Sequence, residues 1–200
     1  MSRKKEDHPY VSRGGIKLAG ALDQFAISVI GRTALDIGAS TGGFTDCLLQ
    51  RGAARVWAID VAYGQFAWKL RQDPRVVTVE RTNVRYLTRE KLYQSSQGQN
   101  EPANFAVIDL SFISLGKVMP AVYNLLADHA EVVALIKPQF EARREQVERG
   151  GIVRDEKVRE EVVNRVKGEA EAAGFKVKRV IKSPIEGADG NVEFLIHLVK

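Results

Sequence analysis

The stretch Asp36-Ile37-Gly38-Ala39-Ser40-Thr41-Gly42-Gly43-Phe44-Thr45 decides how this chain folds. It follows Thr33–Ile37, an apolar run with the length and composition of a buried strand, and it leads into a helical pattern from Phe44 to Arg51. Glycines between a strand and a helix let the backbone approach a ligand closely, and the amino end of the helix favours a negatively charged group. The stretch therefore predicts a strand, a tight loop and a helix that together bind a nucleotide-like cofactor.

The alternation of strands and helices continues on both sides of this loop. A helix with apolar positions at helical spacing is expected from Ile16 to a point before Gly31. A longer helix is expected between Asp155, a favourable amino-terminal cap, and Gly174. Further strands are predicted at Arg55–Asp60, Val76–Glu80, Phe105–Leu110 and Glu131–Ile136, further helices at Gln65–Gln72, Thr88–Tyr93 and Leu115–Ala127, and a polar loop at Ser95–Asn104.

The last two strands, Phe175–Ile181 and Asn191–Val199, are separated by a loop short enough to join an antiparallel pair. The earlier strands alternate with helices, which predicts a mostly parallel sheet covered by helices on both faces. Ligands of such sheets bind at the carboxyl ends of the strands. We therefore expect one α/β domain over residues 10–200, preceded by a charged flexible arm or linker stub over residues 1–9.

The composition limits the possible classes of protein. The 200-residue chain is 44% hydrophobic, which suffices for one substantial core, and its formal net charge of +5 permits a polyanionic partner such as RNA without requiring one. A single cysteine, Cys47, excludes an intramolecular disulfide, and the three histidines lack the spacing of zinc ligands, so no metal is expected. No apolar run approaches the roughly 18 residues that span a bilayer, and the amino terminus lacks an apolar signal segment. These features predict a soluble cytoplasmic protein with no membrane partner.

Two classes of cofactor compete for the glycine loop. The dinucleotide fingerprint places glycine at its first, third and sixth positions, and Ser40 occupies the third, which weakens an NAD site. An acidic residue such as Asp36 is unfavourable beside a pyrophosphate but acceptable beside a cationic amine and sulfonium, which favours S-adenosylmethionine. Asp60, at the end of the next strand, can bind ribose hydroxyls of either cofactor, and Asn83 can pair with adenine or simply form a turn. A glycine turn without a ligand is the third alternative.

Four further segments are specific enough to indicate a family. They are Ser12-Arg13-Gly14-Gly15-Ile16-Lys17-Leu18, Val107-Ile108-Asp109-Leu110-Ser111-Phe112-Ile113-Ser114, Leu135-Ile136-Lys137-Pro138-Gln139-Phe140-Glu141 and Asn191-Val192-Glu193. Together with the glycine loop, they resemble the TlyA, or hemolysin A, family, whose methyltransferase domain is similar to the FtsJ (RrmJ) 2′-O-methyltransferases. The resemblance extends from about His8 to the end of the chain, and its motifs stand in the family's order.

The resemblance implies a class I methyltransferase fold of the Rossmann-like type, with a mostly parallel seven-stranded sheet and an antiparallel C-terminal strand. It implies a catalytic tetrad of Lys17, Asp109, Lys137 and Glu193, with S-adenosylmethionine as the cofactor. It further implies ribosomal RNA or ribosomal subunits as the partner and the 2′-hydroxyl of cytidine as the target. From the loop, the strand ends and the resemblance together, we expect cofactor contacts from Asp36, Gly38, Ser40, Thr41, Gly42, Gly43, Phe44, Thr45, Asp60, Val61, Asn83 and Asp109.

The chemistry explains the use of such a tetrad. A ribose 2′-hydroxyl is a weak nucleophile, so methyl transfer requires it to be aligned with the methyl carbon and relieved of its proton. We expect Lys137, in its neutral form, to contact this hydroxyl and accept the proton. Lys17 nearby would disfavour two positive charges, whereas Asp109 and Glu193 would favour them, and the sequence leaves that balance open. Taken singly, Lys17 and Glu193 would be ordinary exposed residues, whereas Asp109 and Lys137 each end an apolar strand, where sites are built.

Basic residues near the strand ends are candidates for contacts with RNA phosphates. These are Arg13, Arg143, Arg144, Arg149 and Arg154. The alternative for the middle group is a solvated helix face, in which the arginines alternate with Glu141, Glu145 and Glu148. The family usually carries an amino-terminal S4 RNA-binding domain before the segment near His8, where this sequence has only the charged stub.

Three rival functions remain at the level of the sequence. An NAD-dependent oxidoreductase would bind NAD in preference to S-adenosylmethionine, and Ser40 disfavours it. A non-catalytic RNA-binding module would bind RNA without transferring a methyl group, and the intact tetrad disfavours it. A membrane-active hemolysin would need a spanning segment or a strongly amphipathic cationic helix, and the sequence offers neither.

Overall fold

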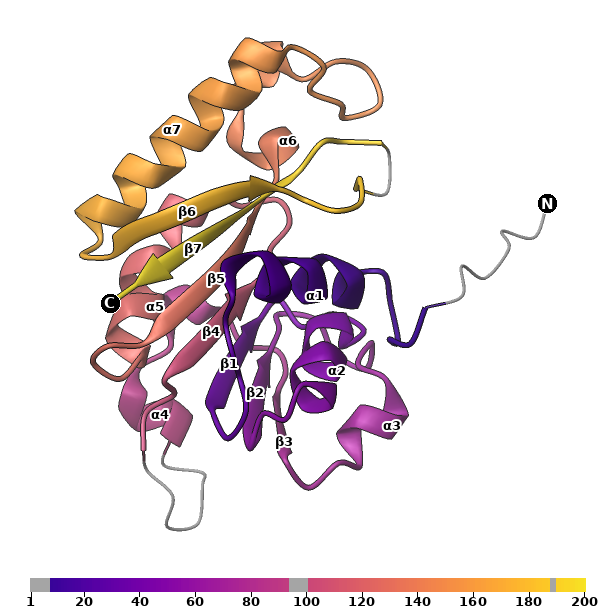
Figure 1. Ribbon diagram of the computed structural model, residues 1–200, viewed down its shortest axis with the longest axis vertical. Coiled ribbons are helices and arrows are strands. Elements are labelled where there is room, and N and C mark those ends of the chain that lie inside the picture. The colour runs from indigo at the N-terminus through magenta and orange to yellow at the C-terminus, as the bar shows by residue number, and fades with distance from the viewer. Residues whose placement is uncertain (1–7, 94–100, 188–189) are drawn as a thin grey trace, which may run out of the picture.

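The computed structural model describes residues 8–93, 101–187 and 190–200, in which seven strands form one sheet (Figure 1). The strands are β1 (Thr33–Ile37), β2 (Arg55–Ile59), β3 (Val76–Val79), β4 (Phe105–Ile108), β5 (Glu131–Ile136), β6 (Lys176–Lys182) and β7 (Phe194–Val199). Their spatial order is β3-β2-β1-β4-β5-β7-β6. Strands β1 to β5 pair in parallel, whereas β7 runs antiparallel to both of its neighbours. The predicted mostly parallel sheet with an antiparallel last strand is confirmed.

Helices cover both faces of this sheet. The helices are α1 (Gly14–Phe25), α2 (Gly43–Gln50), α3 (Trp68–Arg71), α4 (Arg89–Tyr93), α5 (Met119–Leu125), α6 (Pro138–Glu141) and α7 (Glu156–Ala172), with short 3-10 turns η1 (Val84–Tyr86), η2 (Leu115–Lys117) and η3 (Arg144–Gln146). Figure 1 shows α1 and α2 on one face of the sheet and α5 and α7 on the other. Each face therefore buries its own apolar layer.

The two apolar layers explain the composition of the central strands. On one face, Leu18 of α1 and Leu48 of α2 pack with Val107 and Leu135 of the sheet. On the other face, the neighbouring strand residues Ile108 and Ala134 join a cluster that includes Val166 of α7. A strand that is buried on both faces has no polar side to present, so it is apolar along its whole length.

The first helix ends earlier than the periodicity predicts. The sequence predicted a helix up to a point before Gly31, but α1 stops at Phe25 because Ala26 adopts the left-handed conformation with φ 56°. The Ala26 amide donates to the carbonyls of Asp23 and Leu22, which closes the helix in the way that a glycine usually does. Alanine carries no sequence mark of that conformation, so the boundary was not predictable.

Two other predicted helices are shorter than expected, for different reasons. Of Gln65–Gln72 only Trp68–Arg71 is helical, because the Ala67 amide donates to the Thr41 carbonyl of the glycine loop instead of starting a helical ladder. The predicted helix Leu115–Ala127 is divided into η2 and α5. Pro120 has no amide hydrogen to donate one turn back, so a continuous helix cannot run through it, and it lies in the first turn of α5 instead.

Other predicted elements match within a few residues. Asp155 caps α7 by accepting a hydrogen bond from the Lys157 amide at 2.9 Å, as the sequence predicted. Residues 1–7 of the predicted arm and residues 94–100, which cover most of the polar loop, lie outside the described residues. In the part of the chain that the structure describes, no helix is long and apolar enough to cross a membrane.

The strand register brings three loops to one edge of the sheet. Ile37, at the end of β1, pairs with Ile59 of β2 on one side and with Ile108 of β4 on the other. Gly38, Asp60 and Asp109 directly follow these three residues, so they meet at the same carboxyl-terminal edge.

Candidate active site

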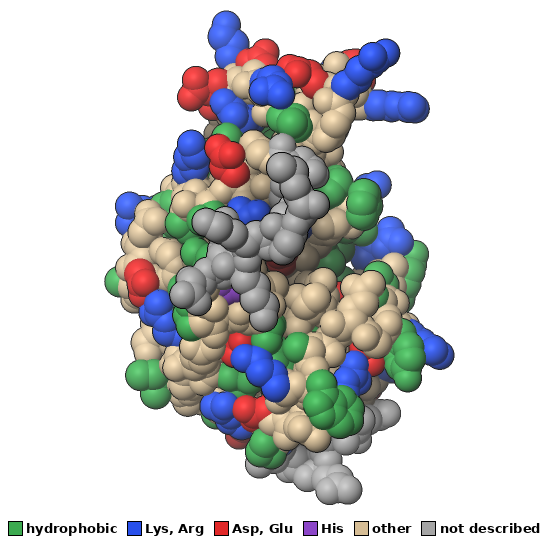
Figure 2. All heavy atoms as spheres, turned by 90° about the vertical axis from the view of Figure 1, so that its right-hand side faces the viewer, with side chains coloured by type: hydrophobic (Ala, Val, Ile, Leu, Met, Phe, Trp, Pro, Cys, Tyr) green, Lys and Arg blue, Asp and Glu red, His purple; other side chains and the backbone are tan. Residues whose placement is uncertain are grey.

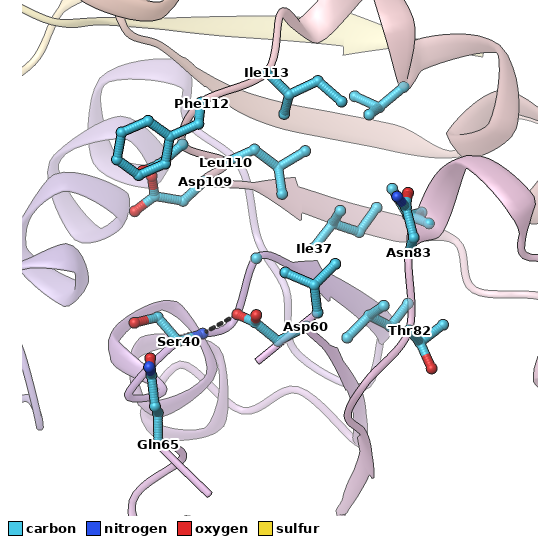
Figure 3. A pocket seen from close by; sticks show the side chains of 16 residues that line it. Ile37, Ser40, Asp60, Gln65, Thr82, Asn83, Asp109, Leu110, Phe112 and Ile113 are labelled. Carbon is cyan, nitrogen blue, oxygen red and sulfur yellow. Dashed lines mark hydrogen bonds between the residues drawn. The ribbon is translucent and has the colours of Figure 1, made fainter. Parts of the chain in front are cut away.

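A cavity of about 490 Å³ opens at the edge where β1, β2 and β4 end (Figure 3). Ile37 and Ile59 line it from the strand ends, and Asn83 lines it from the segment that follows β3. Asp60 and Asp109 line it on opposite sides of the glycine loop. Its volume lies within the roughly 300 to 1,000 Å³ that are usual for small-molecule sites. The cavity is thus large enough for a nucleoside-sized ligand.

Backbone contacts fix the shape of the glycine loop. Gly38 has φ 88°, and a Cβ atom there would lie 2.3 Å from the Asp109 carbonyl oxygen, so only glycine allows this approach of β1 and β4. Ser40 also adopts a positive φ, 49°, and its amide donates to Oδ2 of Asp60 at 2.7 Å. Oδ1 of Asp60 accepts a second backbone hydrogen bond, from Ala62, at 2.8 Å. Asp60 therefore holds both loops that enclose the cavity while it lines the cavity itself.

Asp36 lies behind the cavity wall. Its side chain is fully buried, its Oδ2 accepts a hydrogen bond from the Thr45 hydroxyl at 2.6 Å, and its Oδ1 has no hydrogen-bond partner. Burial raises the pKa of Asp36 to about 7, and the nearby carboxylates of Asp109 and Asp60 act in the same direction, against the hydrogen bond from Thr45. The edge where β1, β2 and β4 end therefore carries three acidic side chains, and that of Asp36 is shielded from water.

The structure separates the expected cofactor residues into three groups. Gly38, Ser40, Asp60, Val61, Asn83 and Asp109 line the large cavity. Thr41, Gly43 and Phe44 line a smaller adjoining cavity of about 190 Å³, which shares Gly38, Ser40 and Asp109 with the first. Asp36, Gly42 and Thr45 line neither, because they are buried beneath the loop. Gly42 serves packing: a Cβ atom at this φ of 98° would lie 2.4 Å from the Leu70 side chain.

The first pair of the expected tetrad joins the two ends of the chain. Lys17 near the start of α1 and Glu193 just before β7 form an ion pair, with Nζ and Oε2 2.5 Å apart. Lys17 is 8% exposed and Glu193 is 2% exposed, so both charges are largely removed from water. A buried charge of this kind is tolerated only with a partner. Lys17 lines the smaller cavity, which places the pair at its wall.

The second pair lies at the adjoining strand ends. Lys137 follows β5 and Asp109 follows β4, and their Nζ and Oδ1 atoms are 2.5 Å apart. Lys137 also donates to the Ser111 hydroxyl at 3.1 Å. Asp109 and Lys17 line the same smaller cavity, and the Gln139 side chain reaches Glu193 at 3.5 Å. The structure thus brings together all four residues of the expected tetrad.

Phe112 lies at the cavity in a way that the sequence did not indicate. Its side chain is 90% exposed although it is large and apolar, and its backbone has φ 64°. Its ring packs against that of Phe140, with centroids 4.8 Å apart, and it lines the large cavity (Figure 3). A bulky residue with positive φ is rare, and its occurrence beside a site suggests a role there. The hydrophobic pattern gives no sign of it, because periodicity predicts burial for such a residue.

Of the five arginines that are expected to contact RNA, only Arg13 lines one of the two cavities. Arg13 lines the smaller cavity and donates to the Glu186 carbonyl at 3.0 Å. Figure 2 shows one face of the molecule, with basic side chains gathered at its top over the loop before α7, mixed with acidic ones. Arg143, Arg144, Arg149 and Arg154 are exposed in this region, and Arg154 pairs with Glu148 at 3.1 Å. Glu141 does not belong to a solvated charge pattern there, because it is only 7% exposed.

In residues 8–93, 101–187 and 190–200, no group of three or more histidine, cysteine or acidic side chains could hold a metal ion.

Comparisons with known proteins agree with this geometry. The family model described as FtsJ-like methyltransferase matches residues 10–200. A Bacillus subtilis protein provisionally named rRNA methyltransferase YqxC is 52% identical over 94% of this chain and 65% of its own length. The 16S/23S rRNA (cytidine-2′-O)-methyltransferase TlyA of Mycobacterium tuberculosis is 49% identical over 96% of this chain and 69% of its own length. The chain thus spans about two thirds of the length of these relatives.

Solved structures support the same assignment. One from Streptococcus thermophilus, provisionally named a hemolysin, has a TM-score of 0.91 and 49% identity, and it covers 98% of this chain and 69% of its own. The sheet order, the antiparallel last strand and the matched family agree with the predicted class I methyltransferase fold. This chain belongs to the FtsJ-like methyltransferase family and, within it, to the group of the TlyA and hemolysin A proteins.

Proposed function

We propose that this chain transfers a methyl group from S-adenosylmethionine to a ribose 2′-hydroxyl of ribosomal RNA, with cytidine as the target nucleoside. The observation that carries the proposal is the arrangement of two lysine–carboxylate pairs, Lys17–Glu193 and Lys137–Asp109, of which Lys17 lines the smaller cavity and Asp109 lines both cavities. The relatives named above as rRNA methyltransferases supply the substrate class. The substrate would be free ribosomal RNA or a ribosomal subunit, and the protein would act in the cytoplasm.

The residues present fit S-adenosylmethionine better than a dinucleotide. Asp36, Asp60 and Asp109 gather at one strand edge, and burial and mutual repulsion disfavour charge on Asp36. A cationic amine and sulfonium beside them would relieve that repulsion, whereas a pyrophosphate would add to it. Asp60 would bind the ribose hydroxyls, and Asn83 and Val61 would contact the adenine.

The chain's own residues would then orient the hydroxyl and manage its proton. When bound, S-adenosylmethionine supplies a methyl group on a positively charged sulfur. Lys137, held by Asp109 and Ser111, would contact the 2′-hydroxyl and fix its direction toward the methyl carbon. The transfer would form a carbon–oxygen bond, break the carbon–sulfur bond and release the hydroxyl proton, which Lys137 would accept once it had released its own proton to water. Glu193 would keep Lys17 in place beside this reaction.

RNA would bind across the face shown in Figure 2. Arg13 at the smaller cavity and Arg143, Arg144, Arg149 and Arg154 on the loop before α7 would contact phosphates. The exposed ring of Phe112 offers a stacking surface beside the reacting groups. The logarithm of the RNA affinity falls linearly with the logarithm of the salt concentration. Replacing one phosphate-binding arginine with alanine should make that slope shallower by about 1.

The test is a methylation assay with a chemical readout. The protein is incubated with S-adenosylmethionine labelled in its methyl group and with unmodified ribosomal RNA, and the RNA is then hydrolysed in alkali. A 2′-O-methyl group blocks cleavage of the adjacent phosphodiester, so label is expected in alkali-resistant dinucleotides. Label found only in mononucleotides, or none at all, would contradict the proposal. Tighter calorimetric binding of NAD than of S-adenosylmethionine would favour an oxidoreductase instead.

A further inference from the structure

The two segments that carry Lys137 and Asp109 lie side by side for their whole length. One is α6, which begins after Lys137 and ends at Glu141. The other is the loop that runs from Asp109, at the end of β4, to the start of η2 at Leu115. Their parent strands are neighbours, since β4 pairs with β5 in parallel. The relative position of the two segments therefore decides where the Lys137 ammonium group lies with respect to Asp109.

Contacts join these segments near the reacting groups and midway along them. At the near end, Nζ of Lys137 lies 2.5 Å from Asp109 and 3.1 Å from the Ser111 hydroxyl. Midway, the ring of Phe112 packs on that of Phe140, with a centroid distance of 4.8 Å. The Phe112 ring in the second contact is 90% exposed, so this contact restrains the loop only weakly, and the first contact holds only the Asp109 end of the loop.

The far end is held by a buried carboxylate. Oε1 of Glu141 accepts a hydrogen bond from the Leu115 amide at 2.7 Å, and the Ser114 side chain bonds to the same carboxylate. Arg165 of α7 donates to the Glu141 carbonyl oxygen at 2.6 Å and to its Oε2 at 3.1 Å. The Glu141 side chain is 2% exposed, whereas that of Arg165 is 45% exposed. The carboxylate is thus enclosed between the two segments, and the arginine supports it from outside.

A carboxylate is a costly choice for this position if packing is its only purpose. Burial raises the pKa of Glu141 above its usual range, against the hydrogen bonds from Leu115 and Ser114 and the charge of Arg165. An apolar side chain of the same size would avoid that cost but would leave the Leu115 amide without an acceptor. The specific property that glutamate provides is therefore the link between α6 and the amide at the end of the loop.

The geometry points to Glu141 as a positioning residue for methyl transfer, which fixes the loop from Asp109 to Leu115 against α6 and is itself braced by Arg165. This inference rests on the proposed function. Because the loop is held at both ends, it can keep Phe112 in its left-handed conformation and Asp109 at the distance that the Lys137 pair requires. Glu141 touches neither cavity, so its effect reaches the reaction only through the loop and Lys137.

The test compares two substitutions of Glu141 that differ in one property. Glu141→Met keeps the approximate volume but removes the acceptor, whereas Glu141→Gln keeps an oxygen for the Leu115 amide. We expect Glu141→Met to lower kcat by roughly 10- to 100-fold, since displacements near 1 Å cost about that much, with the Kd for S-adenosylmethionine within about 3-fold of wild type. The kcat of Glu141→Gln should be at least about tenfold higher than that of Glu141→Met. Glu145→Met, an exposed position on the following 3-10 turn, is the matched control.

Hydrogen exchange at the Leu115 amide gives a readout that does not require activity. Exchange should be faster in Glu141→Met and protected in Glu141→Gln and in the control. Arg165→Met, at a half-exposed side chain, tests the same link if Glu141→Met does not fold, and it should show an intermediate exchange rate and an intermediate kcat. Wild-type kcat in folded Glu141→Met, or unchanged protection of Leu115 there, would overturn the inference. An inactive wild-type protein would refute the proposed function instead, and the exchange comparison would still decide whether Glu141 holds the loop.

Discussion

Lys17 and Glu193 are separated by 176 residues in the chain, yet Nζ of the lysine lies 2.5 Å from Oε2 of the glutamate. The pair joins the first helix to the last strand at the wall of the smaller cavity. Because both side chains are buried, each depends on the other for its compensating charge.

Removing one member of this pair should destabilise the protein more than removing both. Glu193→Gln leaves the Lys17 ammonium group buried without a full counter-charge, so we expect the free energy of unfolding to fall by about 2 to 4 kcal/mol. The double variant Lys17→Met, Glu193→Leu should recover most of that loss, but it should not recover methyl transfer. Urea denaturation and the labelled-methyl assay measure the two effects. A double variant less stable than Glu193→Gln would contradict the expectation.

Lys137→Met should strongly reduce turnover without preventing cofactor binding. The substitution removes the group that is proposed to orient the hydroxyl and take its proton, which should lower kcat by about 100-fold or more. Lys137 lines neither cavity, so the Kd for S-adenosylmethionine, measured by calorimetry, should change by less than about 3-fold. Lys117→Met, at an exposed lysine of η2, serves as the control. Wild-type turnover in Lys137→Met would refute the role of this lysine.

Asp36 should make stability depend on pH. Its pKa is raised from 3.8 to about 7 in the folded protein, so between these values the folded state holds a proton that the unfolded state has released. Stability from this group is therefore complete below about pH 4 and is lost as the pH rises to about 7, by an amount on the order of a few kcal/mol.

Asp36→Asn should remove that dependence, because the amide cannot ionise but can still accept the Thr45 hydrogen bond. At pH 8 the variant should therefore be more stable than wild type, and at pH 4 the two should be similar. The measurement is the difference between the two unfolding free energies at several pH values. A difference that does not change between pH 4 and pH 8 would show that Asp36 titrates normally in the fold.

Phe112→Gly should separate stability from activity. Glycine accepts the positive φ of this position and removes an exposed ring, so the free energy of unfolding should stay within about 1 kcal/mol of wild type or rise. If the ring stacks on a substrate base, its removal should weaken productive RNA binding by roughly 5- to 100-fold. The KM for RNA should therefore rise by a larger factor than the Kd for S-adenosylmethionine, whose proposed cavity Phe112 also lines. An unchanged KM for RNA would exclude stacking by Phe112.

The sequence by itself determined the order of strands and helices, because each element carries a local pattern. Val107 and Val133 are apolar since their strands are buried on both faces, and Asp155 marks the start of α7 since its side chain can cap that helix. The glycine loop was equally predictable, because glycines between an apolar strand and a helical pattern mark a tight loop. The resemblance to a family then indicated which four charged residues form the expected catalytic tetrad.

Only the tertiary structure decided which of these residues meet and which are hidden. Asp36, Gly42 and Thr45 belong to the same quoted stretch as Ser40, yet all three are buried and line neither cavity. The exposure of Phe112 and the burial of Glu141 oppose what their side chains prefer in water. Both depend on contacts between segments far apart in sequence, and local patterns carry no information about such contacts.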